Sequence, residues 1–230
     1  SLYHKKKSSE KNIAEKLSQE NARYMTSVFT PTKMTHSLSW RQANILFYLF
    51  NDFIQDNENS SDEFKGRIAE AMKDYTKSET IKKWIVDEDK IKMKGDIPLN
   101  FFKEPVEEHF GKDVYSTNYL ASFASLAQLQ RHRLIKYSVS SGFEKGALNG
   151  FYIPRLVEAS GKKDEWLDDL YSISKNDFPQ AQLLNVGERG FRENLPAKVE
   201  ERECGLAQLE TARVVDSLLE SYSNHIPEMS

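Results

Sequence analysis

The sequence predicts an α+β protein in which long helices pack on a mixed or antiparallel sheet. Helical periodicity and strand-like alternation both occur along the 230 residues, but not in the regular order of repeated strand–helix–strand units. Hydrophobic residues make up 39% of the chain and charged residues 29%, so the chain can bury a core beneath a solvated surface.

The first third of the chain is expected to be mainly helical. Residues 9–25 carry apolar side chains at helical spacing among charges. After Pro31, the segment 32–39 alternates between two faces and predicts a strand. Residues 40–54 are almost wholly apolar and predict a buried helix. Such a helix has too little polar surface to face water, so another element or another chain must cover it.

A polar stretch separates this part from the next helices. Residues 56–63 are rich in turn-forming residues and predict a linker. Ser60 and Glu63 can form a capping box for a helix with one apolar stripe, and Ser78 can cap a shorter helix. Residues 87–112 are expected to be largely irregular because they contain Gly95, Pro98 and Pro105.

The middle of the chain combines a helix with a strand. Residues 114–117 predict a strand, and Asn118 can cap a helix that ends at residues 131–133. Apolar and polar side chains then alternate over 134–140, which predicts a half-buried strand.

The last third is expected to supply a second strand and two helices. Residues 163–174 and 207–222 have the apolar spacing of helices. Gly187 and Gly190 are typical of turns, and residues 198–206 predict a strand. We therefore expect the sheet to contain 134–140 and about 198–206.

Composition excludes several classes of protein. The net charge of −3 gives no overall basic field, so no nucleic-acid partner is expected. No apolar run approaches membrane-spanning length, so no membrane partner is expected either. Cys204 is the only cysteine, which favours a reducing compartment and a cytoplasmic location. No metal site is expected, because the internal histidines lack ligand spacing: His36, His109 and His225 stand alone. The chain does not begin with Met and is interpreted as a possible segment of a longer protein.

The strongest local motif is Arg131-His132-Arg133, at a predicted helix end followed at once by a strand. Arginine presents a rigid, permanently charged fork that suits phosphate or a carbonyl-rich ring. Cations are also favoured near a helix C-terminus by the helix dipole, without any ligand. These residues alone leave both interpretations open.

A wider pattern around this motif resembles a known family. The stretch ASLAQLQRHRLIKYSVSS at 124–141, followed by FYIP at 151–154, is similar to the signature of the flavin-dependent thymidylate synthases. That signature places Arg-His-Arg on a helix end and then spaced serines and an arginine. The segment 192–196 resembles the family's later Arg-x-x-Leu-Pro element.

Segments near the N-terminus resemble the later half of the same family. They are residues 21–24, 30–34 and 39–41. The implied organisation is a window of a long, duplicated member. Residues 1–55 would be the late half of one thymidylate synthase-like unit, 56–112 a helical insertion or linker, and 113–230 a second unit.

The resemblance implies reductive methylation of dUMP to dTMP. Methylene-tetrahydrofolate would give the carbon, and FAD reduced by NADPH would give the hydride. FAD would lie between subunits of a homo-oligomer, a tetramer in the family. The implied catalytic residues are Arg131, Arg133 and Ser141. The implied cofactor-binding residues are Arg131, His132, Arg133, Ser39 and Arg41, and the implied substrate-binding residues are Gln128, Ser141, Arg23 and Arg192.

The chain also departs from the family pattern. Lys136 stands where a serine is expected, and Phe143 replaces an arginine that helps to hold the nucleotide. The late Asn-x-Arg motif reads Ser39-Trp-Arg41 in one copy and Gln208-Leu-Glu210 in the other. These departures leave a second hypothesis, a catalytically silent domain that shapes an oligomer. A third, an unrelated nucleic-acid-binding domain, is disfavoured by the order of the motifs.

Overall fold

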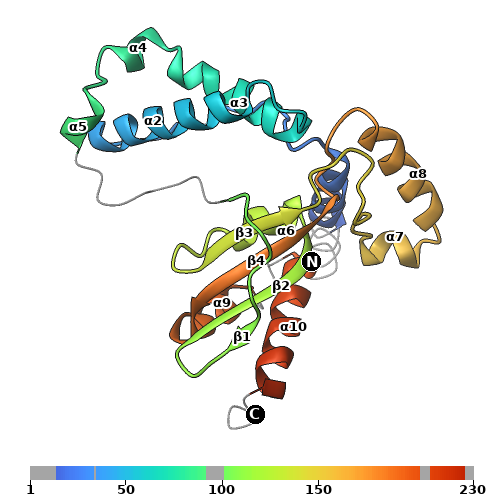
Figure 1. Ribbon diagram of the computed structural model, residues 1–230. Helices are drawn as coiled ribbons and strands as arrows, with labels where there is room; N and C mark the ends of the chain where they lie inside the picture. The colour runs from blue at the N-terminus through green and yellow to red at the C-terminus, as the bar shows by residue number, and fades with distance from the viewer. Residues whose placement is uncertain (1–13, 34, 92–100, 203–207, 226–230) are drawn as a thin grey trace, which may run out of the picture. The chain divides into compact units, whose positions relative to one another are not determined.

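The computed structural model describes residues 14–33, 35–91, 101–202 and 208–225 (Figure 1). The chain divides into two compact units, one formed by Ser1–Thr30 with Lys103–Ser230 and the other by Pro31–Phe102. These bounds differ from the three segments expected from the sequence. Within the second unit, the helix after residue 39 packs on the helix that follows it.

The discontinuous unit contains a four-stranded antiparallel sheet in the order β1-β2-β4-β3. Its strands are β1 (His109–Phe110), β2 (Val114–Ser122), β3 (Lys136–Ser141) and β4 (Leu183–Phe191). Together with the helices around it, the sheet confirms the α+β class. The strand expected over 134–140 is confirmed as β3, which pairs with β4 from Lys136 opposite Arg189 onward.

The second expected strand, over 198–206, is wrong. Residues up to 202 belong to the helix α9 (Leu195–Arg202), which follows the short η2 (Arg192–Asn194), and 203–206 lie outside the described residues. The sheet instead uses β4, whose glycines suggested turns. A Cβ at Gly187 would lie 2.7 Å from the Oγ of Ser138, so glycine is needed there for close strand packing rather than for a turn.

The cap expected at Asn118 is also wrong, because β2 continues to Ser122. The Asn118 amide instead donates to the carbonyl of Val106 at 2.7 Å and accepts from its N–H at 3.0 Å. Ser122 caps the following helix, α6 (Phe123–Leu129), by accepting from the N–H of Ser125. The strand therefore passes directly into the helix that ends at the Arg-His-Arg motif.

Two helices at the C-terminal end accompany one face of the sheet (Figure 1). They are α9 and α10 (Leu209–His225), and the latter confirms the helix expected over 207–222. Their shared core consists of Tyr115, Leu195, Leu218 and Tyr222.

A separate core joins the N-terminal segment to α6 and to α8 (Lys163–Ser174). The short α7 (Arg155–Ala159) precedes α8 and has no buried residue. Residues 14–22 are helical and lead into η1 (Arg23–Met25), where Tyr24 is buried. This core comprises Tyr24, Ala124, Ala147, Phe151, Leu170 and Ala181.

The named elements of the unit Pro31–Phe102 are all helices in the part of the chain that the structure describes. The long α2 (Trp40–Asn57) packs on α3 (Glu63–Thr76), and α4 (Glu79–Lys82) and α5 (Glu88–Ile91) follow. Ser39 and Gln42 form the capping box of α2. Asp62, not Ser60, caps α3 by accepting from the N–H of Lys65.

The strand expected over 32–39 is absent from the described residues of that segment, which exclude Met34. Those residues are mostly exposed, so no buried face supports a strand. Within the described part of the chain, no helix is both long and apolar enough to span a membrane.

Candidate functional site

The Arg-His-Arg motif forms a turn between α6 and β3. The N–H of Arg131 donates to the carbonyl of Gln128 at 3.2 Å, and the N–H of His132 donates to that of Leu129 at 3.1 Å. The N–H of Ile135 donates back to the carbonyl of His132 at 3.2 Å. Leu129 and Ile135, which flank the turn, are both buried. The turn is therefore fixed by backbone hydrogen bonds and by an apolar anchor at each end.

The three side chains of the motif point to two different environments. Arg131 and Arg133 are exposed, and neither has a hydrogen-bond or ion-pair partner among the described residues. The side chain of His132 is only 9% exposed. The turn thus presents two free guanidinium groups to solvent and tucks the imidazole between them inward.

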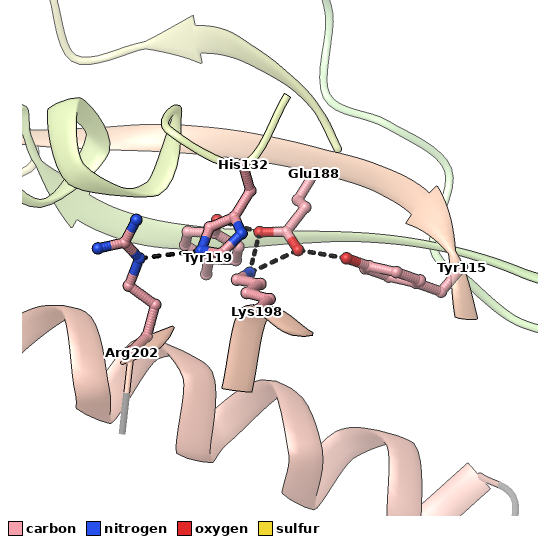
Figure 2. A network of polar contacts seen from close by, with 6 residues as sticks. All are labelled: Tyr115, Tyr119, His132, Glu188, Lys198 and Arg202. Atoms are coloured by element: carbon pink, nitrogen blue, oxygen red, sulfur yellow. Dashed lines mark hydrogen bonds and ion pairs between the residues drawn. The ribbon is translucent and has the colours of Figure 1, made fainter. Parts of the chain in front are cut away.

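His132 contacts a cation from α9. The Nε of Arg202 donates to the Nε2 of His132 at 3.0 Å (Figure 2). An arginine N–H can only donate, so Nε2 must accept and the neutral ring must carry its proton on Nδ1. Burial lowers the pKa of His132, and the Arg202 charge lowers it further. Glu201 opposes this effect, since its Oε2 lies 3.4 Å from the same Nε2.

Next to this contact lies a fully buried ion pair. The Nζ of Lys198 lies 2.6 Å from each carboxylate oxygen of Glu188, and both side chains have no exposed surface. The hydroxyls of Tyr115 and Tyr119 also donate to Glu188 (Figure 2). Burial lowers the pKa of Lys198, although Glu188 counteracts this effect. The carboxylate accepts four hydrogen bonds, which is what a charge buried this deeply requires.

A second polar cluster joins the N-terminal segment to α6 and to the start of α10. The Oε1 of Gln208 accepts from the Nη2 of Arg23 at 3.2 Å and from the Nε2 of Gln128 at 2.7 Å. The Nε of Arg23 and the Nε2 of Gln208 are buried donors that have no partner within the described part of the chain. Gln128 and Arg23, both expected at the substrate, are therefore brought together with two unused donors beside them.

Glu210 is buried beside this cluster, and its hydrogen bonds join elements of the fold. Its carboxylate accepts from the hydroxyl of Tyr24, from the backbone N–H of Ser122 and from the hydroxyl of Ser122, each at 2.7 Å. Burial raises the pKa of Glu210, while these donors lower it. The position where the resemblance expected an arginine is thus occupied by an acid that ties η1, β2 and α10 together.

The remaining expected site residues lie elsewhere. Ser141 ends β3 just after a β-bulge and is half-buried. Arg192 follows β4 and lines a cavity of about 770 Å³ between η2, α9 and α10, with its Nη1 3.5 Å from the carbonyl of Lys112. Ser39 and Arg41 belong to the other compact unit, at the start of α2.

The two residues that depart from the family pattern near the motif, Phe143 and Lys136, lie in different surroundings. Phe143 is 7% exposed and lies near Phe123, with ring centroids 6.4 Å apart, so it belongs to the apolar interior. Lys136 is exposed at the first position of β3.

Sequence reasoning missed Arg202, Lys198 and Glu188. Reading 198–206 as a strand hid the four-residue spacing of Lys198 and Arg202, which places both on one face of a helix. Reading Gly187 and Gly190 as turns hid a glutamate in the middle of a central strand.

No protein-family model matches the chain, and no curated protein is similar to it.

Proposed function

We propose that the turn at 131–133 binds the anionic groups of FAD and dUMP, and that the chain is part of an enzyme resembling the flavin-dependent thymidylate synthases. The observation that supports this proposal best is that the motif exposes its two arginines while it buries the histidine between them. Arg131 and Arg133 face solvent without a partner among the described residues, on a turn anchored by buried residues at both ends. The backbone of the turn is therefore fixed, and each guanidinium is left available for a phosphate group.

The cluster around Gln208 supports a ligand on the same helix. Buried donors without a partner are rare in folded proteins. The Nε of Arg23 and the Nε2 of Gln208 are two such donors, and Gln128 lies one turn of chain before Arg131. A carbonyl or phosphate oxygen of a bound nucleotide would satisfy them once it displaced the side chains that cover both donors.

The residues of the turn match the proposed ligands in charge. FAD and dUMP are both anionic, and the turn supplies two free cations to hold them. When bound, reduced flavin supplies the hydride for the methylation, with NADPH as the reductant and methylene-tetrahydrofolate as the carbon donor. The side chains of this chain would bind and orient these molecules rather than react with them. By the same resemblance, copies of the chain would assemble as a homo-oligomer.

A catalytically silent domain is the second candidate. Phe143 lies in the apolar interior, so the arginine of the family has no substitute at that position. Glu210 is an acid committed to three hydrogen bonds. Both observations favour a thymidylate synthase-like unit that has kept its fold while losing part of a nucleotide site.

Calorimetric titration of dUMP and of FAD separates the two candidates. A lost charged hydrogen bond costs about 1.5–3 kcal/mol, so Arg131→Ala and Arg133→Ala should each weaken binding at least about tenfold. Arg155→Ala is the matched control, because Arg155 is also exposed but lies on α7. Circular dichroism should show all three variants folded.

Each other outcome has a definite meaning. Wild type that binds neither ligand would favour the silent domain. Wild type that binds while both variants bind equally well would show that the turn is not the site.

A further inference from the structure

We infer that Glu188 is a positioning residue for the turn at 131–133, acting through Lys198 and α9 on the contact between Arg202 and His132. The inference rests on the proposed binding role of that turn. The contacts that carry it run from the centre of the sheet to the motif without a gap (Figure 2).

The first step is the way α9 docks on the sheet. Three of its eight residues are buried, namely Leu195, Lys198 and Arg202. Leu195 is the only apolar residue among them. Lys198 is held by two 2.6 Å hydrogen bonds to Glu188, so a polar contact fixes the middle of the helix.

The second step is the spacing along α9. Lys198 and Arg202 are four residues apart and lie on one face of the helix. Fixing Lys198 against β4 therefore fixes where Arg202 begins, one turn later. From that position its Nε reaches the Nε2 of His132 at 3.0 Å.

The third step concerns the carboxylate itself. Tyr115 and Tyr119 on β2 donate to Glu188, so the acid is held from the neighbouring strand as well as from α9. An ion pair buried to this extent adds little net stability compared with apolar residues of the same volume. The ion pair does hold Lys198 in a single position, because each of its hydrogen bonds has a preferred direction. A positioning residue must fix its partner in this way.

The consequence for His132 is a fixed proton position. While Arg202 donates to Nε2, the imidazole stays neutral with its proton on Nδ1. The charges that face this ring come from the turn, from β4 and from α9. They are Glu188, Lys198, Glu201 and Arg202, and the exposed arginines that flank His132 on the turn are the nearest charges along the chain. If Arg202 is displaced, Nε2 loses its donor and becomes free to take a proton.

The test is the titration of His132 by NMR without any ligand. The chain has five histidines, and His132→Gln identifies the resonance. Arg202→Met removes the contact directly and should raise the His132 pKa toward its ordinary value of about 6.5. The double variant Glu188→Gln/Lys198→Met removes both charges of the ion pair. Their direct effects on His132 are opposite in sign, so they largely cancel.

We expect the double variant to raise the His132 pKa by at least half the shift seen in Arg202→Met. Val199→Ala, on the same helix but outside the ion pair, should leave it unchanged. A double variant with the wild-type His132 pKa would overturn the inference, because a merely structural pair would affect stability alone.

If that variant does not fold, Tyr115→Phe/Tyr119→Phe provides a second test, since it loosens Glu188 without changing charge. It should also raise the His132 pKa, and no rise would overturn the inference. Failure of wild type to bind FAD or dUMP would count against the proposed function only, since the titration needs no ligand.

Discussion

The hydroxyl of Tyr24 donates a 2.7 Å hydrogen bond to the carboxylate of Glu210, which lies 186 residues further along the chain. The contact is buried and links η1 to the first turn of α10. Glu210 also receives both donors of Ser122, the residue at which β2 passes into α6. One carboxylate therefore holds together three segments that the sequence keeps far apart.

Substitution of Glu210 should destabilise the protein strongly. Glu210→Ala leaves the N–H and hydroxyl of Ser122 and the hydroxyl of Tyr24 without their acceptor, and we expect a loss of about 3 kcal/mol. Tyr24→Phe removes one donor only and should cost about 1 kcal/mol. Urea unfolding gives both values. Glu220→Ala, at an exposed position of α10, should change stability by less than about 0.5 kcal/mol. Equal stability of Glu210→Ala and Glu220→Ala would show that the buried cluster is not structural.

Alkaline pH should unfold the protein through its tyrosines. Burial, and then the Glu188 charge, raise the pKa of Tyr115, Tyr119 and Tyr137 above the ordinary value of 10.0. Above pH 10 the unfolded chain loses protons that the folded chain keeps. The resulting stability is complete below pH 10 and is lost as the pH rises toward the folded pKa values. We expect the free energy of unfolding to fall above pH 10, with tyrosinate absorbance appearing together with unfolding.

A variant checks the origin of that pH dependence. Tyr115→Phe/Tyr119→Phe should flatten the fall in stability above pH 10, because two of the groups responsible are gone. Tyr24, Tyr137 and Tyr152 remain in both proteins, and because burial raises the pKa of each, they set the residual slope. An unchanged slope in the variant would assign the effect to other groups.

Gly142 should be intolerant of any side chain. Its φ is +101°, and a Cβ there would lie 2.5 Å from the carbonyl oxygen of Leu183. Gly161 has a φ of +71° but nothing within 4 Å of its Cβ position. Gly161→Ala should therefore cost only the backbone strain of about 1 kcal/mol, while Gly142→Ala should cost about 2 kcal/mol more from the collision with backbone. Urea unfolding of the two variants measures the difference, and equal costs would refute the close approach.

The sequence predicted the elements whose side-chain pattern is local. The apolar run after Ser39 became the helix α2, although only Ala43, Asn44, Phe53 and Ile54 of it are buried rather than most of its surface. The alternation around Tyr137 became β3. The prediction failed at β4, where residues distant in the chain determine which side chains fit. Gly187 leaves space for the side chain of Ser138, and Glu188 accepts hydrogen bonds from Lys198 and two tyrosines.

The candidate site was predicted in part for the same reason. Arg131 and Arg133 are recognisable because their residue types sit together at a helix end. Arg202 was not, since its contact with His132 depends on how α9 docks, and that depends on a buried ion pair between a strand and a helix. Gln128 and Arg23 meet only through Gln208, a contact that spans most of the chain.

The position of the helical unit within the chain has a consequence for folding during synthesis. The unit Pro31–Phe102 is inserted between the two parts of the sheet-containing unit. Its helices pack on sequence neighbours, so it can form as soon as it leaves the ribosome. The segment carrying Tyr24 is made earlier but must wait for Glu210. At about 5–20 residues per second, the intervening 186 residues take about 10–40 s to make. The core partners of Tyr24 are made sooner, beginning with Ala124, so the apolar face of the first segment lacks a partner from its own unit until that part of the chain has left the ribosome. For that time it is an exposed apolar surface to which a chaperone can bind.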